Sequence, residues 1–401
     1  MNILVLDTIH GGGEIARHLI SSGHTADTVD IYRHAQGIDQ AQALARTYDC
    51  IVAPVHTDPD HPLLQRPGIP RITHHEAVGR ILGRNAPRPM VEITGARGKT
   101  TTATALASLF EGPGVLHTSQ GTVDYPDRVL LWKRSIAPAS VIDAAARARA
   151  RNGWLIAEES LGVSGAGTLG VLTAGEDYPV AAGKKRALAE KKRLLTRCAT
   201  VVAAPGIAPW ADCVIRADEV AACAGGTCRY ARDGIEGSFT NPLLHLDGYR
   251  TPLVTAAAAA CCCGIDPAPL AGFRALEGRM STHRIGDALL VDNANSGTNT
   301  ATAVDAARYA RLLAPGRGIV LVIGLEAATV CEGFPEEAME EAIGRIGPVS
   351  VVLVGVTGAV GERLAAAGIP WEHCWTLQEA RDRACARAGR ESIVLSVKTW
   401  R

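Results

Sequence analysis

Val91-Glu-Ile-Thr-Gly-Ala-Arg-Gly-Lys-Thr-Thr-Thr102 places a Gly-Lys-Thr phosphate loop between an apolar strand and an alanine-rich helix. Backbone N–H groups of a glycine-rich turn, together with the positive end of the following helix, form a cradle for phosphate oxygens. The pattern predicts that Lys99 reaches the outer phosphates and that the Thr100 hydroxyl holds magnesium. The less favoured interpretation is a glycine turn before an ordinary helix. The expected nucleotide site consists of Gly95, Ala96, Arg97, Gly98, Lys99, Thr100 and Thr101.

The composition indicates a globular protein with two or three domains. The chain has 401 residues, of which 47% are hydrophobic, enough for well-filled cores. Its 41 basic and 41 acidic residues cancel, so no overall field attracts nucleic acid or an anionic membrane. The first residues run directly into a strand, and no apolar run reaches the roughly 18 residues of a membrane span. We therefore expect a cytoplasmic protein with neither nucleic acid nor membrane as partner.

The eleven cysteines do not form the pattern of a disulfide framework. They are scattered and odd in number, and Cys261, Cys262 and Cys263 are consecutive. Cys223 and Cys228 suggest a metal pair, but no second pair at zinc spacing accompanies them. Reduced, mostly buried thiols are the favoured interpretation.

Residues 1–88 alternate apolar runs with helical stretches and predict a small Rossmann-like domain. A strand at Ile3 to Leu6 leads to the loop His10-Gly-Gly-Gly13, a helix from Glu14 and a strand that ends near Asp30. A nicotinamide dinucleotide site is the alternative, because Asp30 follows the glycine loop at about the distance of a ribose-binding acid. The loop lacks the G-x-G-x-x-G spacing, so this alternative is not favoured.

Residues 89–277 and 278–401 predict two further α/β domains. In the first of these, Trp154-Leu-Ile-Ala-Glu-Glu-Ser-Leu-Gly162 is a short apolar strand that ends in acids. A carboxylate at the carboxyl end of a strand can reach a ligand held at a neighbouring strand-to-helix loop. The last domain alternates strands, at 288–291, 319–323 and 351–354, with helices, which indicates another parallel sheet.

Only Ala96 and Arg97 separate Gly95 from Gly98, and this shortened loop resembles that of the Mur ligases and folylpolyglutamate synthetases. The resemblance spans essentially the whole chain. It implies a three-domain α/β architecture, with Rossmann-like N- and C-terminal domains flanking a P-loop ATPase domain. It also implies an ATP- and Mg²⁺-dependent ligase that converts a substrate carboxylate into an acyl phosphate, with the first domain holding the substrate and the last closing on ATP.

The Mur ligase resemblance implies roles for further residues. Glu158 matches the family's Glu-x-Ser-Ser glutamate and would bind magnesium with Thr100, with Glu159 as a substitute candidate. Lys191, with Lys192 close behind, matches a lysine that becomes an additional magnesium ligand if it is carbamylated; a solvated basic helix face is the alternative. Arg279, Asp292 and Asn295 are expected to contact ATP. The expected catalytic residues are Lys99, Glu158 and Arg279.

Three segments resemble the coenzyme F(430) synthetase family more than the cell-wall ligases: 4–13, 159–167 and 291–299. That resemblance implies a nickel tetrapyrrole substrate, whose nickel arrives inside the substrate, and intramolecular attack of a ring carbon on an activated propionate. Two alternatives stay open, namely an amide ligase that joins an amino acid to a carboxylated precursor and a regulatory protein with a decayed site. The oligomeric state, monomer or homodimer, also stays open. So does the base that accepts the proton of the attacking carbon, for which Glu159, Tyr178 and His283 are candidates. The expected substrate residues are His10, Gly11, Gly12, Gly13 and Arg33, with His74-His75 as a weaker candidate pair.

Overall fold

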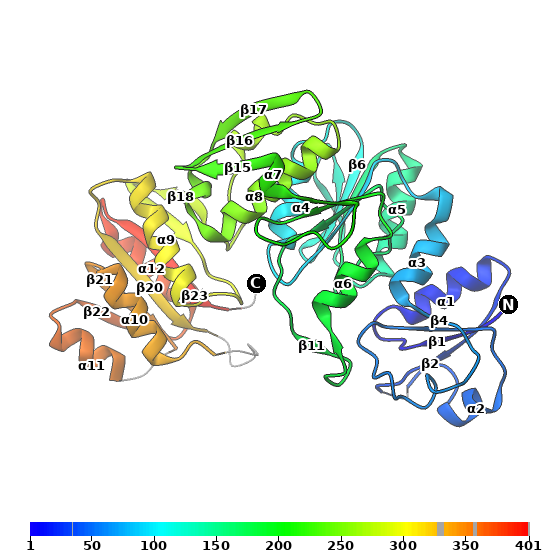
Figure 1. Cartoon of the computed structure of the whole chain (residues 1–401). Coiled ribbons are helices and arrows are strands. Elements are labelled where there is room, and N and C mark those ends of the chain that lie inside the picture. Colours follow the sequence, from blue (N-terminus) through cyan, green and yellow to red (C-terminus); the bar gives the residue numbers. More distant parts are fainter. Residues whose placement is uncertain (34, 327–332, 356–358, 400–401) are drawn as a thin grey trace. The chain divides into compact units, whose positions relative to one another are not determined.

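The computed structural model describes residues 1–33, 35–326, 333–355 and 359–399, which form two compact units. One unit consists of Met1–Phe239 and Thr251–Ala271, and the other of Thr240–Arg250 and Gly272–Arg401. Figure 1 shows the helices and strands in sequence order. Among the described residues, no helix is both long and apolar enough to cross a membrane.

The first sheet is parallel throughout and has the strand order β2-β1-β3-β4. Its first helix begins at Gly12 rather than at Glu14, because Gly11 adopts a φ of 95° as N-cap and a Cβ on Gly12 would lie 2.1 Å from the Asp7 carbonyl oxygen. The elements are β1 (Asn2–Leu6), α1 (Gly12–Ser21), β2 (Thr25–Val29), α2 (Gln40–Ala45), β3 (Cys50–Ala53), β4 (Arg71–Thr73), α3 (His74–Leu82) and the 3₁₀ turn η1 (Gly83–Asn85).

The second sheet carries the phosphate loop and has the order β14-β13-β10-β5-β9-β6-β7-β8. Its strands from β14 to β6 are parallel, whereas β7 and β8 are added antiparallel. Strand β5 is central and runs into α4, as predicted. The elements are β5 (Met90–Thr94), α4 (Lys99–Ala107), β6 (Gly114–Thr118), β7 (Gly121–Tyr125), β8 (Val129–Trp132), α5 (Ser140–Ala150), β9 (Trp154–Glu158), β10 (Leu169–Leu172), α6 (Ala187–Leu195), β13 (Thr200–Ala203), β14 (Val214–Arg216) and α7 (Ala217–Val220).

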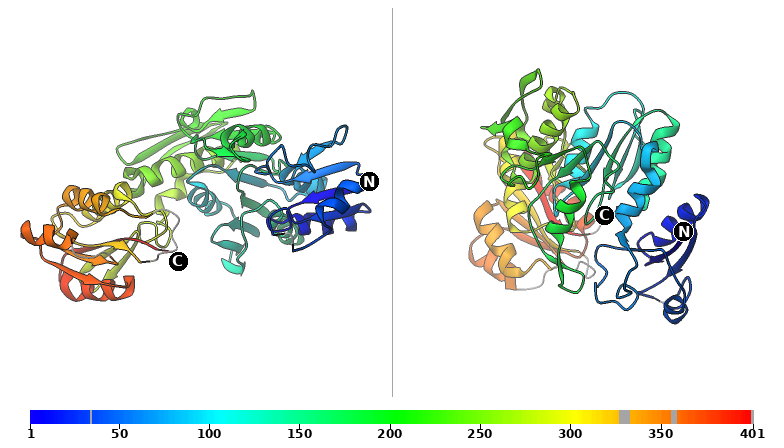
Figure 2. Two further views of the ribbon diagram at one scale, coloured as in Figure 1. Left: turned by 90° about the horizontal axis from the view of Figure 1, so that it is seen from below. Right: turned by 45° about the vertical axis from the view of Figure 1, so that its right-hand side comes forward.

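The two sheets share one hydrophobic core, which explains why they form a single compact unit. Helix α3 packs against both α1 and α5 (Figure 2). Apolar side chains of the first sheet, these three helices and the second sheet are all buried in one cluster, which includes Val5, Ile15, Val78, Val141 and Leu155. The chain also forms a β-hairpin of β11 (Pro179–Val180) and β12 (Lys185–Arg186) and a three-stranded sheet of β15 (Ala221–Ala224), β16 (Thr227–Arg232) and β17 (Ile235–Thr240). The turn η2 (Pro242–His245) belongs to the second unit, and helix α8 (Asp247–Cys262) begins in the second unit and continues in the first from Thr251. The turn η3 (Ala268–Gly272) ends the last stretch of the first unit.

The second unit contains a six-stranded sheet with the order β18-β19-β23-β20-β21-β22, in which only β18 is antiparallel. The strands predicted at 288–291, 319–323 and 351–354 are present as β19, β20 and β21. The elements are β18 (Ser281–Ile285), β19 (Ala288–Asp292), α9 (Thr300–Leu313), β20 (Ile319–Leu325), α10 (Glu336–Ile346), β21 (Ser350–Val354), α11 (Ala359–Ala366), β22 (Trp371–Cys374), α12 (Leu377–Ala388) and β23 (Ser392–Lys398).

The three sheets follow one another in the order predicted for three α/β domains. The compact units divide at other residues than the predicted domains, since 240–250 belongs with the second unit and that unit resumes at Gly272. The domain boundaries at 88 and 277 therefore stay a prediction. The ten described cysteines are free thiols, as the sequence indicates.

A buried carboxylate in β5 organises the loop that follows β9. Glu92 is fully buried, and its Oε1 accepts the N–H groups of Ser164 (2.8 Å) and Gly165 (3.2 Å), while its Oε2 accepts that of Gly167 (2.7 Å). Glu159 is also fully buried, and burial and the neighbouring Glu92 raise its pKa well above the usual range. Burial and the neighbouring Glu92 carboxylate therefore favour the protonated form of Glu159.

We predict that Glu159→Gln stabilises the protein at neutral pH more than at pH 5. The folded-state pKa of Glu159 is raised, so the stability that this carboxyl contributes is present below its unfolded pKa and is lost as pH rises. Glutamine keeps an N–H donor and does not titrate. The difference in unfolding free energy between variant and wild type should grow from pH 5 to pH 7 in urea melts. Exposed Glu236→Gln is the control, and a difference that is constant with pH would contradict the prediction.

Candidate active site

The phosphate loop is clamped between β5 and the end of β10. A Cβ on Gly95 would lie 2.2 Å from the Thr173 Oγ1, which itself donates a hydrogen bond to the Arg97 carbonyl oxygen (2.6 Å). Gly98 adopts a φ of 80° and is the N-cap of α4. Because glycine has no side chain to cap a helix, the first N–H groups of α4 remain for an anion. The loop therefore has the features of a phosphate cradle.

Lys99, Thr100 and Glu158 meet at the start of α4. The Thr100 hydroxyl donates to Glu158 Oε2 (2.9 Å), and the Lys99 Nζ lies 3.8 Å from Glu158 Oε1 and 3.2 Å from the Gly95 carbonyl oxygen. The side chain of Glu158 is 2% exposed. A hydroxyl and a carboxylate oxygen are ligands that suit magnesium, so these residues fit that ion. Glu158, and not Glu159, contacts Thr100.

Ser119 is a member of this cluster that the sequence analysis missed. Its backbone N–H donates to Glu158 Oε2 (3.1 Å), and its hydroxyl lies 3.2 Å from the Thr100 hydroxyl. Ser119 directly follows β6, which pairs in parallel with β9. The pairing of these two strands would have been the signal, because the ends of neighbouring parallel strands lie at the same edge of a sheet.

The other predicted loop residues have different surroundings. Arg97 is exposed, and its Nε lies 2.5 Å from Glu176 Oε1. Ala96 is half-buried, whereas Thr101 is buried within α4, so its backbone N–H is the group that faces the helix start. These residues thus offer main-chain groups to a phosphate, and Arg97 adds an exposed positive charge that is paired with Glu176.

The second unit brings together Arg279, Asp292 and Asn295. Asp292 ends β19 and is buried, and its Oδ1 accepts the Ala294 N–H (3.0 Å). The Asn295 side chain donates to the Gly278 carbonyl oxygen (2.7 Å), next to exposed Arg279. Tyr249 also holds this segment, because its hydroxyl donates to the Arg279 carbonyl oxygen and accepts the Leu276 N–H.

Lys191 and Lys192 differ in burial. Lys191 is fully buried, its Nζ donates to the Tyr178 hydroxyl (3.3 Å), and it lies 4.7 Å from the centre of that ring. Burial and the charge of Lys99 lower the pKa of Lys191 to about 8. Lys192 is half-buried and lies 4.9 Å from the Trp210 ring. The alternative that Lys191 lies on a solvated basic helix face is therefore wrong.

The predicted substrate loop lies at a cavity of about 240 Å³, which is lined by His10, Pro54, Val55, His56, His74, His75, Ala137, Pro138, Ser160 and Leu161. Gly11 packs closely, since a Cβ there would lie 2.5 Å from Ala139 Cβ, whereas Gly13 has open space. Gly11 and Gly12 therefore have a structural reason to be glycine. Arg33 is exposed and is not among the lining residues.

His74 and His75 are the first two residues of α3, and both side chains are buried. His74 Nε2 bonds to the Leu6 carbonyl oxygen (2.9 Å) and His75 Nε2 to that of Ser160 (2.8 Å). Burial lowers the pKa of His74 to about 4 and that of His75 to about 3, so both are neutral at pH 7.

The chain is 31% identical over 470 aligned residues to coenzyme F(430) synthetase of Methanosarcina acetivorans, and the match covers 100% of this chain and 98% of that protein. The chain belongs to the coenzyme F(430) synthetase family. Residues 282–399 also match the family model described as Coenzyme F430 synthetase CfbE, C-terminal domain. The resemblance inferred from segments 4–13, 159–167 and 291–299 is thereby confirmed.

Solved structures show the same fold at low sequence identity. FolC of Escherichia coli, solved with DHPP and ADP, has a TM-score of 0.53 and 14% identity, with 81% of this chain and 89% of that chain covered. UDP-N-acetylmuramate-alanine ligase of Thermotoga maritima has a TM-score of 0.50 and 14% identity over 99% of this chain and 95% of that chain. The three-domain Mur ligase-like fold is confirmed, and this member of the coenzyme F(430) synthetase family is an ATP-dependent ligase.

We predict that Thr100→Val weakens magnesium binding, so that ATP turnover requires a higher magnesium concentration. Valine has nearly the same shape as threonine but lacks the oxygen that lies 2.9 Å from Glu158. The magnesium concentration at half-maximal ADP formation should rise by roughly tenfold or more, because the metal loses one oxygen ligand. Thr104→Val is the matched control, since Thr104 lies one turn further along α4 and its hydroxyl bonds to the Thr100 carbonyl oxygen (2.8 Å). An unchanged magnesium requirement in Thr100→Val would refute the metal site.

Proposed function

We propose that this protein closes the carbocyclic ketone ring of coenzyme F(430). ATP would phosphorylate the free propionate of 15,17(3)-seco-F(430)-17(3)-acid, and a ring carbon of the same tetrapyrrole would attack the acyl phosphate, with ADP and phosphate released. The observation that carries the proposal is the cluster of Lys99, Thr100 and Glu158 at a phosphate loop, in a chain that matches a coenzyme F(430) synthetase over its full length.

The residues of the loop would act by positioning and by offsetting charge. Main-chain N–H groups of 95–101 would bind the phosphates, and Lys99 would oppose the charge that develops on the transferred phosphoryl oxygens. Thr100 and Glu158 would hold magnesium, which neutralises phosphate charge when bound. Arg279, Asp292 and Asn295 are proposed ATP contacts of the second unit. No side chain need form a covalent bond, because the substrate supplies the nucleophile.

The cavity at His10 supports a substrate that is bound by one edge. Its volume of about 240 Å³ lies below the roughly 300–1,000 Å³ of pockets that enclose a drug-sized ligand. A tetrapyrrole is larger still, so the cavity would admit one side arm or one ring. The N–H groups of Gly11 and Gly13 and the exposed Arg33 are the proposed donors to its carboxylates. His10 is the proposed substrate residue at the cavity wall, whereas the Gly12 N–H is already bonded to the Asp7 carbonyl oxygen.

We further propose that Lys191 is carbamylated and is an additional magnesium ligand. Carbamylation requires the neutral amine to attack carbon dioxide, and a buried lysine with a pKa of about 8 is partly neutral at physiological pH. The neutral fraction rises as pH increases through about 8 and falls nearly tenfold per unit below pH 7. Tyr178, in contact with the Lys191 Nζ, would donate its hydroxyl to the carbamate.

The carbamate can be detected by ¹³C NMR of the protein with ¹³C-labelled bicarbonate and magnesium. We expect one carbamate signal, lost in Lys191→Ala and kept in Lys192→Ala, the neighbouring control. Carbamate formation should be slower at pH 6.5 than at pH 8, because less of the amine is neutral. A signal that survives in Lys191→Ala, or full activity of that variant, would overturn the assignment.

The substrate is tested by ADP release with magnesium and ATP. The nickel seco precursor is compared with a panel of amino acids combined with cell-wall and folate acceptors, while the tetrapyrrole absorption spectrum is recorded. We expect ADP release only with the precursor, coupled to a shift of the tetrapyrrole spectrum and the loss of one water. In Lys99→Ala, this ADP release should disappear. Release only with an amino acid would instead establish an amide ligase.

A further inference from the structure

Asp7 is a buried carboxylate held rigidly at the end of β1. It is fully buried, and its backbone adopts a φ of 69°, a left-handed conformation that non-glycine residues rarely take. Its Oδ1 accepts the N–H groups of Ile9 (2.9 Å) and His10 (3.2 Å), and its carbonyl oxygen accepts that of Gly12 (3.0 Å). The loop between β1 and α1 is thus built around this carboxylate, which has little freedom to move.

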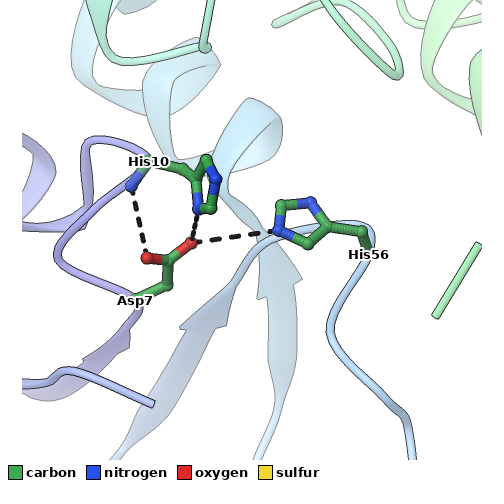
Figure 3. A group of neighbouring side chains, drawn as sticks. All are labelled: Asp7, His10 and His56. Atoms are coloured by element: carbon green, nitrogen blue, oxygen red, sulfur yellow. Dashed lines mark hydrogen bonds and ion pairs between the residues drawn. The ribbon is translucent and has the colours of Figure 1, made fainter. Parts of the chain in front are cut away.

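The second oxygen of Asp7 fixes the tautomer of His10. His10 Nδ1 bonds to Asp7 Oδ2, so Nδ1 carries the proton and Nε2 carries the lone pair. Figure 3 shows that the other ring nitrogen points away from the carboxylate. The side chain of His10 is 49% exposed and lines the cavity described above. A buried carboxylate behind an accessible imidazole is the arrangement of a general base with its orienting partner.

The other titratable groups around His10 leave this pair intact. His56 Nε2 lies 3.9 Å from the same Asp7 oxygen, and the His10 and His56 rings meet edge to face at 4.9 Å. Burial, and then the charge of His10, lower the pKa of His56, so it is neutral at pH 7. Burial, and then Asp7, raise the pKa of Tyr32, whose ring lies 5.6 Å from His10. His74 is neutral as well. If His10 takes up a proton, these neighbours therefore add no second positive charge beside Asp7, and the imidazolium of His10 keeps its ion pair with that carboxylate.

The cavity connects His10 to the phosphate-loop sheet. Ser160 and Leu161, which line it, follow Glu158 by two and three residues. His75 joins the two sides, because its Nε2–H donates to the Ser160 carbonyl oxygen. A substrate arm in the cavity would therefore have His10 on one side. On its other side would be Ser160 and Leu161, which follow the proposed magnesium ligand Glu158.

We propose that His10 is the base that removes the proton from the attacking ring carbon, with Asp7 as its positioning residue. This inference rests on the proposed ring closure. The C–H electron pair becomes the new C–C bond to the acyl carbon, the acyl C–O bond breaks, and phosphate leaves with that pair. The proton goes to His10 Nε2 and then to water. Asp7 stabilises the imidazolium.

A divalent-metal site is the competing interpretation, because Asp7, His10 and His56 present ligand atoms within 4.8 Å of one another. Asp7 Oδ1 already accepts two N–H groups and Oδ2 holds the His10 proton. Binding a metal at Asp7 would break that contact and compete with N–H donors that have no other partner in the loop. The hydrogen-bond pattern therefore favours the base.

The test separates carboxylate activation from ring closure. His10→Asn should still form acyl phosphate, trapped as a hydroxamate with hydroxylamine, within about threefold of wild type, while ring closure falls on the order of 10²–10⁴-fold. Asp7→Asn should lower kcat for ring closure and leave KM for the tetrapyrrole unchanged. Imidazole in the buffer should restore part of the ring closure of His10→Ala, which a structural role would not allow. His18→Asn is the matched control on the adjacent helix, and circular dichroism checks the fold of each variant.

Several outcomes would overturn the proposal. Unchanged ring closure in His10→Asn would put the base elsewhere, and parallel loss of hydroxamate and ring product would make His10 a substrate-binding residue only. One equivalent of bound zinc or nickel that is lost in His10→Asn would establish the metal site. Loss of a nickel-centred spectral change on binding, in His10→Asn alone, would make His10 a ligand of the substrate's nickel. Absence of any hydroxamate from wild type with the precursor would instead refute the proposed function itself.

Discussion

The hydrogen bond between the Thr100 hydroxyl and Glu158 is the contact on which the site depends, because it joins the first turn of α4 to the end of β9. Strands β5 and β9 are parallel neighbours, and their register pairs Ile93 with Glu158. A slip of one residue would turn the carboxylate to the other face of the sheet. The pairing of these parallel strands thus fixes the position of the Glu158 carboxylate. On the other side of β5, β10 extends the parallel sheet, and Thr173 at its end supports the phosphate loop.

The alternation of side chains along an extended chain gives Glu158 and Glu159 opposite environments. Glu158 faces the phosphate loop, whereas Glu159 points into the interior against Glu92. Glu92 in turn accepts the N–H groups of Ser164, Gly165 and Gly167, which ties the segment after β9 to the sheet. One short stretch of chain therefore presents the carboxylate proposed to bind magnesium, a buried anchor and, at Ser160 and Leu161, one wall of the cavity.

The sequence predicts those parts of the fold and site that depend on local signals. The phosphate loop, the strand that begins at Trp154, the strand predicted at 288–291 and the acid at the end of β9 each follow from a spacing or a short apolar run. Ser119 could not be predicted, because its role comes from the pairing of β6 with β9. The burial of Lys191 and of His74 and His75 likewise results from packing between elements far apart in the chain, which a single sequence does not reveal.

The histidines around the cavity show why burial matters as much as identity. His56, His74 and His75 are kept neutral by burial, so these three imidazoles add no positive charge that would hold a substrate carboxylate in an unproductive place. His10 alone of these four side chains is both half exposed and backed by a carboxylate. We therefore propose that the fold divides two tasks: the start of α4, where Lys99 lies, would meet the phosphate charge, and the loop after β1 would accept the proton. Ser160 and Leu161 line the cavity together with His10 and follow Glu158 closely in the chain, so the proposed base and the segment after the proposed magnesium ligand meet at one cavity.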